Sequence, residues 1–179
     1  MPHGLGYYRA ISWHNNDNTV DSGTVRFWEN VFKFFYVVVV FCTSQIQKSE
    51  LAMSKIHLSL VFHNHQPVGN FDYIFHDAYE KAYKPLTDCL DRHPTILAAM
   101  HFTGPLLDWL MANQPAYLDQ VASQAQRGQL EILTGAYYEP ILAMLQDADK
   151  LGQIQKLNQV IEQLFGTTPA GLWLAERIW

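Results

Sequence analysis

The sequence predicts an α/β fold in which parallel strands form about half of a barrel. From Met53 onwards, short apolar runs alternate with segments of helical period in the order βαβαβαβ. Strands in that order pair in parallel through right-handed crossovers. Four such units are about half of a (β/α) barrel, and the chain stops at Trp179, directly after the fourth strand. We therefore expect the N-terminal part of a truncated barrel.

The first unit begins with an apolar strand over 56–62 (IHLSLVF). Apolar residues then recur at helical spacing from Phe71 to Leu90, and Pro85 marks a kink or break within that helix. The polar segment HNHQP therefore begins directly where the strand ends.

Two more strands and a pair of helices follow. Residues 96–102 (ILAAMHF) form the second strand, and helices are expected over 105–112 and 115–127. Gly128 ends the second of these helices, and 129–133 (QLEIL) form the third strand.

The last helix begins at Asp147, which can cap it, and Gly166 closes it at the C-terminal position that favours glycine. Residues 171–174 (GLWL) then form the fourth strand. The apolar residues expected to share one face of this helix are Leu151, Ile154, Ile161, Leu164 and Phe165.

Residues 1–52 differ from the rest because they show no sustained period. The run 34–42 (FFYVVVVFC) is far shorter than the roughly 20 apolar residues of a membrane-spanning helix, and its β-branched valines favour a strand. It also lies behind acidic residues, unlike a signal peptide. We interpret 1–52 as an unassigned extension, or a misassigned start, that need not belong to the native protein, and 53–179 as the folding unit.

Composition narrows the possible partners. An apolar content of 49% and a charged content of 16% are typical of a globular protein. The net charge of −5 gives no attraction to nucleic acid or to anionic membranes. Cys42 and Cys89 lie in dissimilar contexts and have no CxxC spacing, so we expect both to be reduced thiols. We expect a cytoplasmic protein that binds neither nucleic acid nor membranes.

Polar side chains lie at the carboxyl ends of all four predicted strands, where parallel α/β folds place their chemistry. Four such coincidences on one rim favour a functional site over chance. The residues are His63, His65 and Gln66 after the first strand, His101 at the end of the second, Glu139 after the third, and Glu176 with Arg177 after the fourth.

Each of these residues also has a purely structural interpretation. His101 lies in an apolar strand and could be a hydrogen-bonded core histidine. Glu139 could form a salt bridge with Arg177 or Lys84, and Glu176 could form a buried pair with Arg177. As carboxylates from consecutive strands, Glu139 and Glu176 could instead flank a glycosidic bond, which retaining hydrolysis requires at a separation of about 5–5.5 Å.

Three segments resemble the signatures of glycoside hydrolase family 57. The segment 63–71 (HNHQPVGNF) is similar to the first signature, in the form of the α-amylase and 4-α-glucanotransferase branch. The segments 128–132 (GQLEI) and 138–140 (YEP) together resemble the second signature, and 173–179 (WLAERIW) resembles the third. The resemblance covers 53–179.

The resemblance implies an incomplete, TIM-like (β/α)7 barrel and a retaining double displacement on α-1,4-glucans. It implies that Glu176 is the nucleophile, which bonds to the anomeric carbon, and that an aspartate is the general acid/base. That aspartate takes the second catalytic role from Glu139. No metal or other cofactor is needed for this chemistry.

The same resemblance implies contacts with an α-glucan or maltooligosaccharide. By motif position, His63, His65 and Glu139 are expected to bind the sugar beside the cleavage point. From their chemistry or their place on the rim, the further candidates are Gln66, His101, Tyr138, Trp173 and Trp179.

The acid/base aspartate belongs to a fourth signature, which these 179 residues do not contain. We therefore expect the chain alone to have little or no activity. Two other functions remain open: a metal-dependent polysaccharide deacetylase on a related barrel, with His63 and His65 as metal ligands, and a non-catalytic glucan-binding fragment. A truncated product with exposed sheet edges that does not fold stably is a third interpretation.

Overall fold

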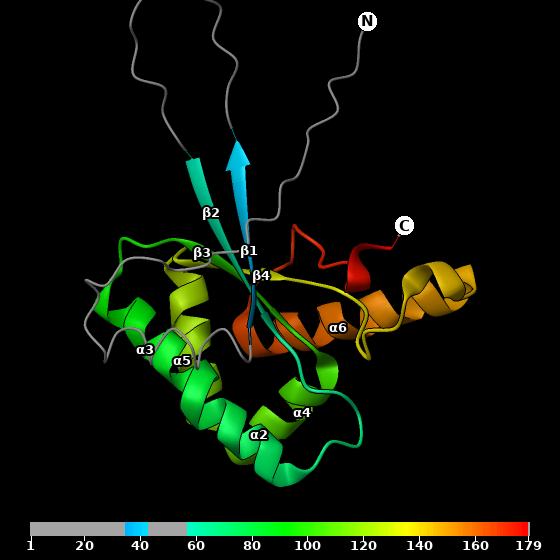
Figure 1. The fold of residues 1–179 in the computed structure, drawn as a ribbon, viewed down its shortest axis with the longest axis horizontal. Helices are drawn as coiled ribbons and strands as arrows, with labels where there is room; N and C mark the ends of the chain where they lie inside the picture. The colour runs from blue at the N-terminus through cyan, green and yellow to red at the C-terminus, as the bar shows by residue number, and fades with distance from the viewer. Residues whose placement is uncertain (1–34, 43–56, 179) are drawn as a thin grey trace, which may run out of the picture.

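The computed structural model describes residues 35–42 and 57–178. Within them the strands form one sheet in the order β1-β2-β3-β4, and Figure 1 shows the helices gathered along one side of these strands. Of β1 only the backbone is described. The remainder of the proposed extension 1–52 and the candidate residue Trp179 lie outside the described residues.

Three strands run parallel, as the sequence predicts. Strand β2 (His57–Asn64) pairs with β3 (Ala98–Phe102), and β3 pairs with β4 (Leu130–Leu133). The register places His63 directly beside His101. Because parallel strands in register bring their carboxyl ends to one edge of the sheet, the polar residues that follow them lie together.

Strand β1 (Phe35–Cys42) departs from the predicted all-parallel order. It pairs antiparallel with β2 along its whole length. Its β-branched residues indicate a strand but carry no information about direction, so the antiparallel pairing was not predicted. Since β3 joins β2 only from Val61 onwards, β1 is the one partner of the first residues of β2 among the described strands.

The first helical segment is continuous, but its hydrogen-bonding pattern changes twice. Helix α2 (Asp72–Ala78) passes into a π-helical turn, η1 (Tyr79–Tyr83), which passes into α3 (Lys84–Arg92). The predicted interruption near Pro85 is thus confirmed as a widened turn. Because proline lacks an N–H and its ring crowds the preceding turn, one extra residue in that turn relieves the conflict.

The predicted helices after β3 are confirmed as α4 (Gly104–Asn113) and α5 (Pro115–Gln126). The long helix α6 (Asp147–Phe165) is confirmed too, and Gly166 ends it with a left-handed φ of 65°. Within the described part of the chain, no helix combines the length and the apolar character needed to cross a bilayer.

Two details of α6 differ from the prediction. Asp147 is the first helical residue and pairs with Lys150, while Gln146 precedes the helix without a side-chain cap bond. Leu151 is 58% exposed, because the first turns of α6 run beyond the sheet (Figure 1), whereas Leu157 is fully buried. The apolar face is therefore displaced toward the end of the helix.

The predicted fourth strand over 171–174 is reduced to a single parallel bridge between Leu172 and Thr134. The N–H of Thr134 donates to the carbonyl of Gly171 at 2.9 Å, and the N–H of Trp173 donates to the carbonyl of Thr134 at 2.7 Å. Among the described residues the segment has no strand on its other side, so the ladder ends there. The bridge brings Trp173 to the edge where β2 and β3 end.

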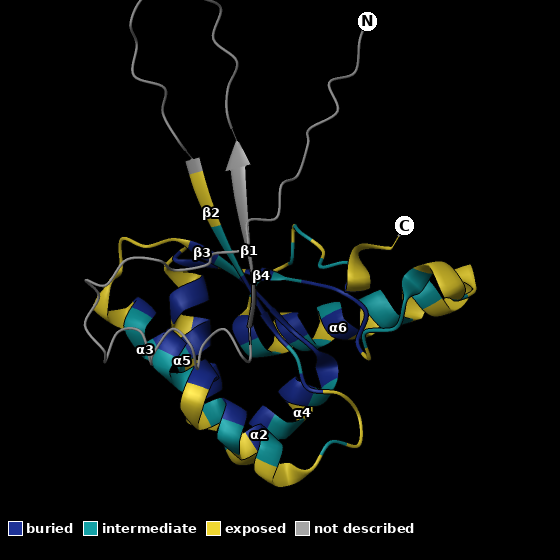
Figure 2. Ribbon diagram, in the orientation of Figure 1, coloured by how far each residue is buried: buried dark blue, intermediate teal, exposed yellow. Residues whose placement is uncertain are grey.

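The core lies between the sheet and its helices, and Figure 2 shows the buried residues concentrated there. The ring of Phe102 on β3 stacks on that of Phe165 on α6, with centroids 6.0 Å apart. This contact joins the centre of the sheet to the last helix. The other large, fully buried apolar side chains of this layer are Met100, Leu106, Leu107, Leu110, Leu157 and Ile161.

A close contact at the start of α4 fixes the loop after β4. The N–H of Gly104 donates to the carbonyl of Tyr137 at 2.8 Å. A Cβ at Gly104 would lie 2.3 Å from the Tyr137 ring, whose hydroxyl bonds to Asp108 at 2.6 Å. Only glycine lets the helix approach the loop this closely.

Gly104→Ala should lower the free energy of unfolding by about 1–3 kcal/mol, because the Tyr137 ring must move. Gly152→Ala is the control, since Gly152 lies in α6 with no atom near its added Cβ. It should raise stability by about 0.5–1 kcal/mol. Urea unfolding measures both changes. An unchanged free energy of unfolding in Gly104→Ala would contradict the close contact with Tyr137.

Candidate functional site

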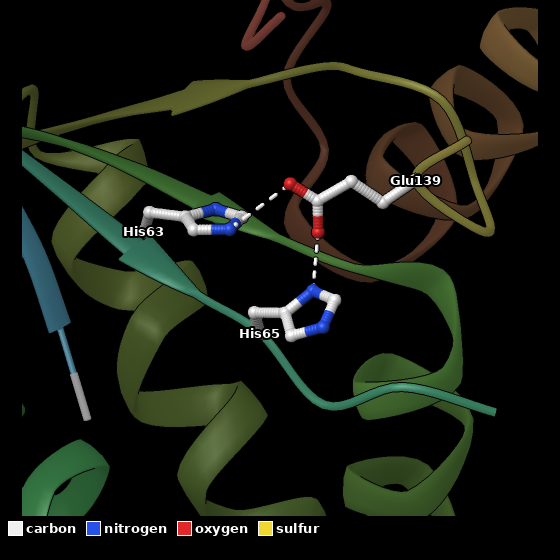
Figure 3. A group of neighbouring side chains, drawn as sticks. All are labelled: His63, His65 and Glu139. Atoms are coloured by element: carbon white, nitrogen blue, oxygen red, sulfur yellow. Dashed lines mark hydrogen bonds and ion pairs between the residues drawn. The ribbon is translucent and has the colours of Figure 1, made fainter. Parts of the chain in front are cut away.

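The structure brings three predicted site residues into one cluster at the carboxyl edge of the sheet. His63 is near the end of β2, His65 lies just beyond that strand, and Glu139 comes from the loop after β4. Figure 3 shows both imidazole rings turned toward the Glu139 carboxylate. Residues 74 and 76 positions apart in the sequence thus meet because their strands are parallel and nearly adjacent.

Glu139 is the centre of this cluster because both carboxylate oxygens are engaged. Nε2 of His63 lies 3.0 Å from Oε1, and Nδ1 of His65 contacts Oε2. The indole Nε1–H of Trp173 also donates to Oε1, at 3.1 Å. Three donors from three segments therefore converge on one carboxylate whose side chain is only 11% exposed.

The donors keep Glu139 ionised. Burial of its carboxyl group raises the pKa, but the hydrogen bonds from His63 and His65 hold the pKa well below its usual range. The cluster therefore presents a fixed negative charge and a set of N–H groups at the sheet edge.

Trp173 adds an aromatic wall. Its ring stacks on the imidazole of His63 with centroids 4.4 Å apart and planes 10° apart. His101 continues the stack, with its ring centroid 5.0 Å from that of His63. Stacked rings restrict the rotation of each imidazole, so they orient His63 toward Glu139.

His101 lies behind the cluster and is completely buried. Burial is the main cause that lowers the pKa of its imidazole to about 3, so the ring is neutral. Its Nδ1 lies 2.8 Å from Nδ1 of His63, and its backbone carbonyl accepts a bond from Asn64. The core interpretation of His101 is therefore confirmed in its burial, and its ring also supports the cluster.

The hydrogen bonds fix which nitrogens carry protons. A carboxylate only accepts, so Nε2 of His63 carries a proton and donates to Glu139, while Nδ1 of His63 accepts from Nδ1–H of His101. Nε2 of His101 is then a bare nitrogen, consistent with its lack of a hydrogen-bond partner. The opposite arrangement would bury an N–H without an acceptor, which is rarer and costlier.

Gly135 closes the space beside that bare nitrogen. A Cβ at Gly135 would lie 2.6 Å from Nε2 of His101 and 3.1 Å from the carbonyl oxygen of Trp173. The backbone of the β4 loop therefore packs directly against the ring of His101, and no larger residue fits without displacing it.

A second group of side chains holds the loop that carries His65. The hydroxyl of Tyr83, from the π-helical turn, donates to the carbonyl of His65 at 3.2 Å. Gln66 is buried: its amide donates to Tyr83 at 3.0 Å and accepts from Asn70 at 2.7 Å. Its N–H donates to Thr103 at 3.3 Å. Gln66, a predicted substrate contact, thus has its side chain engaged within the loop.

Tyr138 and Glu176 are not joined to the cluster. Tyr138 is 49% exposed, and its hydroxyl accepts a bond from Lys156 on α6 at 2.8 Å. Glu176 is exposed in the short turn η3 (Ala175–Arg177), and its side chain forms no hydrogen bond or ion pair with another described residue. Glu139, Glu176 and Arg177 all have a left-handed φ of 53–56°, which is strained for residues with a side chain.

The alternative ion pairs of Glu139 and Glu176 are absent from the described residues. Lys84 pairs with Asp88 on its own helix, at 2.6 Å. Arg177 is exposed and bonds neither glutamate. Asp88 lies one turn further along the same helix as Lys84, and this spacing makes it a ready partner for the lysine.

The sequence interpretation missed the supporting residues of the cluster. From the sequence, no role was assigned to Tyr83, Asn64, Thr103 or Gly135. Tyr83 and Thr103 act through the loop backbone of 65–66. Such roles depend on tertiary contacts that no local spacing encodes.

Labelled with 15N, the chain should show His63 with its proton on Nε2 and His101 with its proton on Nδ1 in two-bond correlation spectra. His101→Leu should lower the free energy of unfolding by about 1–3 kcal/mol, because it removes the buried hydrogen bond from His101 to Nδ1 of His63. His101→Asn, which keeps a donor near Nδ1, should cost less. A proton on Nε2 of His101 would contradict the assignment.

The chain matches known proteins over most of its length. The model of glycosyl hydrolase family 57 matches residues 11–179, beginning before Met53. Alpha-amylase 1 of Dictyoglomus thermophilum is 51% identical over 124 residues, 69% of this chain and 18% of that protein. The 4-alpha-glucanotransferase of Thermococcus kodakarensis is 41% identical over 127 residues, 71% of this chain and 19% of that protein. The chain therefore spans about a fifth of the length of these relatives.

Solved structures agree with this similarity. The crystal structure of 4-alpha-glucanotransferase from Thermococcus litoralis has a TM-score of 0.64 and 44% identity, over 66% of this chain and 19% of that chain. A GH57-type branching enzyme from Pyrococcus horikoshii shares the fold, with a TM-score of 0.54 at 17% identity over 65% of this chain and 34% of that chain. The resemblance of the three sequence signatures is thereby confirmed, and the chain belongs to glycosyl hydrolase family 57.

Proposed function

We propose that the chain forms part of a retaining enzyme that acts on α-1,4-glucans, and that its cluster of His63, His65 and Glu139 binds the sugar beside the bond that is cleaved. The observation that supports this most is the ionised Glu139 carboxylate, held by two imidazoles at the carboxyl edge of parallel strands. That edge is where (β/α) barrels carry their active sites.

The chemistry of the cluster suits a sugar. Hydroxyl groups both donate and accept hydrogen bonds, so a carboxylate can accept from one hydroxyl while an imidazole contacts the next. His65 is the accessible member, with 40% of its side chain exposed. The Trp173 ring lies beside His63, where an aromatic face can stack against a pyranose ring. Tyr138 and Trp179 are proposed as outer aromatic walls, and Gln66 and His101 as supports.

We assign the nucleophile to Glu176. Its motif, WLAERIW, motivates the assignment, and its exposed carboxylate has no competing partner among the described residues. In the proposed reaction Glu176 attacks the anomeric carbon, while an aspartate outside these 179 residues protonates the leaving oxygen. That aspartate then activates water for hydrolysis or a sugar hydroxyl for transfer. The names of the relatives include both outcomes, amylase and glucanotransferase.

The proposed architecture is the N-terminal part of an incomplete (β/α)7 barrel formed by 53–179. Three parallel strands and the bridge at Thr134 support the start of such a barrel. We retain Met53 as the proposed start of the folding unit, although the family match begins at residue 11.

A metal-dependent deacetylase is the second candidate, because His63, His65 and Glu139 could together hold a metal ion. Family membership argues against it, since the matching family consists of glycosyl hydrolases. The two functions differ in their response to chelation. A deacetylase loses activity when its metal is removed, whereas the glucan enzyme does not need one.

Titration calorimetry with maltotetraose tests the sugar site in this chain. The wild-type chain should bind, and Glu139→Gln should weaken binding by about tenfold or more, because a hydrogen bond to a charged group is worth about 1.5–3 kcal/mol. Glu162→Gln is the control, since Glu162 is exposed on α6. Equal affinities of the two variants would reject the site. No release of reducing sugar is expected, and turnover by the chain alone would refute the need for an external acid.

The nucleophile can be tested in a chimera in which 53–179 replace the matching segment of the Thermococcus litoralis 4-alpha-glucanotransferase. A mechanism-based glucosyl label should modify Glu176, as peptide mass spectrometry can show. Glu176→Gln should lose the label together with at least about 10³-fold of the turnover, because covalent catalysis has no substitute there. Labelling of Glu139 in the wild-type chimera would overturn the assignment.

A further inference from the structure

We propose that the His63–His65–Glu139 cluster is also a reversible binding site for a divalent transition metal of the Zn²⁺ type, and that the metal and the sugar exclude each other. The competition rests on the proposed sugar site, whereas the metal binding itself rests only on the three side chains.

The donor set is that of an open zinc site. Each of the three residues offers one ligand atom, and these atoms all lie within 4.8 Å of one another. Two imidazole nitrogens and one carboxylate oxygen form the protein ligands of many four-coordinate zinc sites that keep one position open. Zn²⁺ binds such atoms at about 2.0–2.2 Å, so tetrahedral ligands lie about 3.3 Å apart. The 3.0 Å between Nε2 of His63 and Oε1 of Glu139 is already close to that value.

The surrounding residues hold the ligands in place before a metal arrives. Trp173 donates to Glu139 and stacks on His63. Nδ1 of His63 is bonded to His101, so that ring has the outer partner that metal-binding imidazoles usually have. His65 remains 40% exposed and gives the ion a path from solvent.

The same partner explains why binding should be reversible. When Nε2 of His63 binds a metal, its proton must leave that atom, and Nδ1 must carry the ring proton instead. Nδ1 of His101 then accepts, and the proton of His101 moves to Nε2, which has no hydrogen-bond partner in the described residues. Burying that N–H costs free energy. The site therefore favours an exchangeable ion over a permanent structural one.

A metal in this position blocks the sugar. It would take the lone pairs of the imidazoles and the carboxylate oxygens that the proposed sugar contacts need. Zn²⁺ should therefore reduce maltotetraose affinity, and EDTA should restore it. This response is opposite in sign to that of a metal-dependent deacetylase, which EDTA inactivates.

Cobalt titration of the full 179-residue chain tests the metal site directly. Co²⁺ should give visible d–d absorption that saturates at one ion per chain and is lost on adding Zn²⁺. His65→Ala and Glu139→Gln should each weaken Co²⁺ binding by about tenfold or more. His76→Ala is the matched control, because His76 is exposed on α2, where it pairs with Asp72 at 3.3 Å and packs edge-on against the Trp109 ring. This variant should bind Co²⁺ like the wild type.

The outcomes are separable. Unchanged Co²⁺ binding in both His65→Ala and Glu139→Gln, with far-ultraviolet circular dichroism like that of the wild type, would overturn the metal site. If Glu139→Gln fails to fold, His65→Ala decides, because His65 lies in a half-exposed loop. Co²⁺ binding without any maltotetraose binding would uphold the metal site and reject the proposed function. Maltotetraose binding that Zn²⁺ leaves unchanged would reject the competition alone.

Discussion

The arrangement of the polar edge depends on one buried negative charge. Glu139 accepts hydrogen bonds from His63, His65 and Trp173, which come from the first strand of the parallel set, the loop after it and the bridged segment after α6. An ion in so enclosed a position is stable only when its lone pairs are satisfied. The bridge between Thr134 and Leu172 and the strained backbone at Glu139 both serve this convergence.

Much of the fold could be predicted because the relevant signals are local. The strands near 57–64, 98–102 and 130–133 follow from apolar runs of strand length, and their parallel order follows from the helices between them. The direction of β1 could not be predicted, because a run of valines pairs equally well in either sense. The bridge at 171–174 fell short of a strand because, among the described residues, its outer side has no partner.

The site was predictable to the extent that strand ends define it. Parallel strands carry His63, His101 and Glu139 to one edge, so their proximity follows from topology. The separate roles of these residues do not follow from topology. His101 is buried behind His63, and the side chain of Gln66 is hydrogen-bonded within its own loop and to Tyr83. Both facts depend on burial and on side-chain contacts that a single sequence does not encode.

The π-helical turn at Tyr79–Tyr83 determines the direction in which the later side chains of this helix point around its axis. Each residue of an α-helix advances the side chains by about 100° around the axis. Removal of one residue from this turn would swing the Tyr83 hydroxyl away from the His65 carbonyl while leaving the length of the helix almost unchanged. A single-residue deletion here, far along the chain from Glu139, would thus loosen the imidazole that meets the carboxylate.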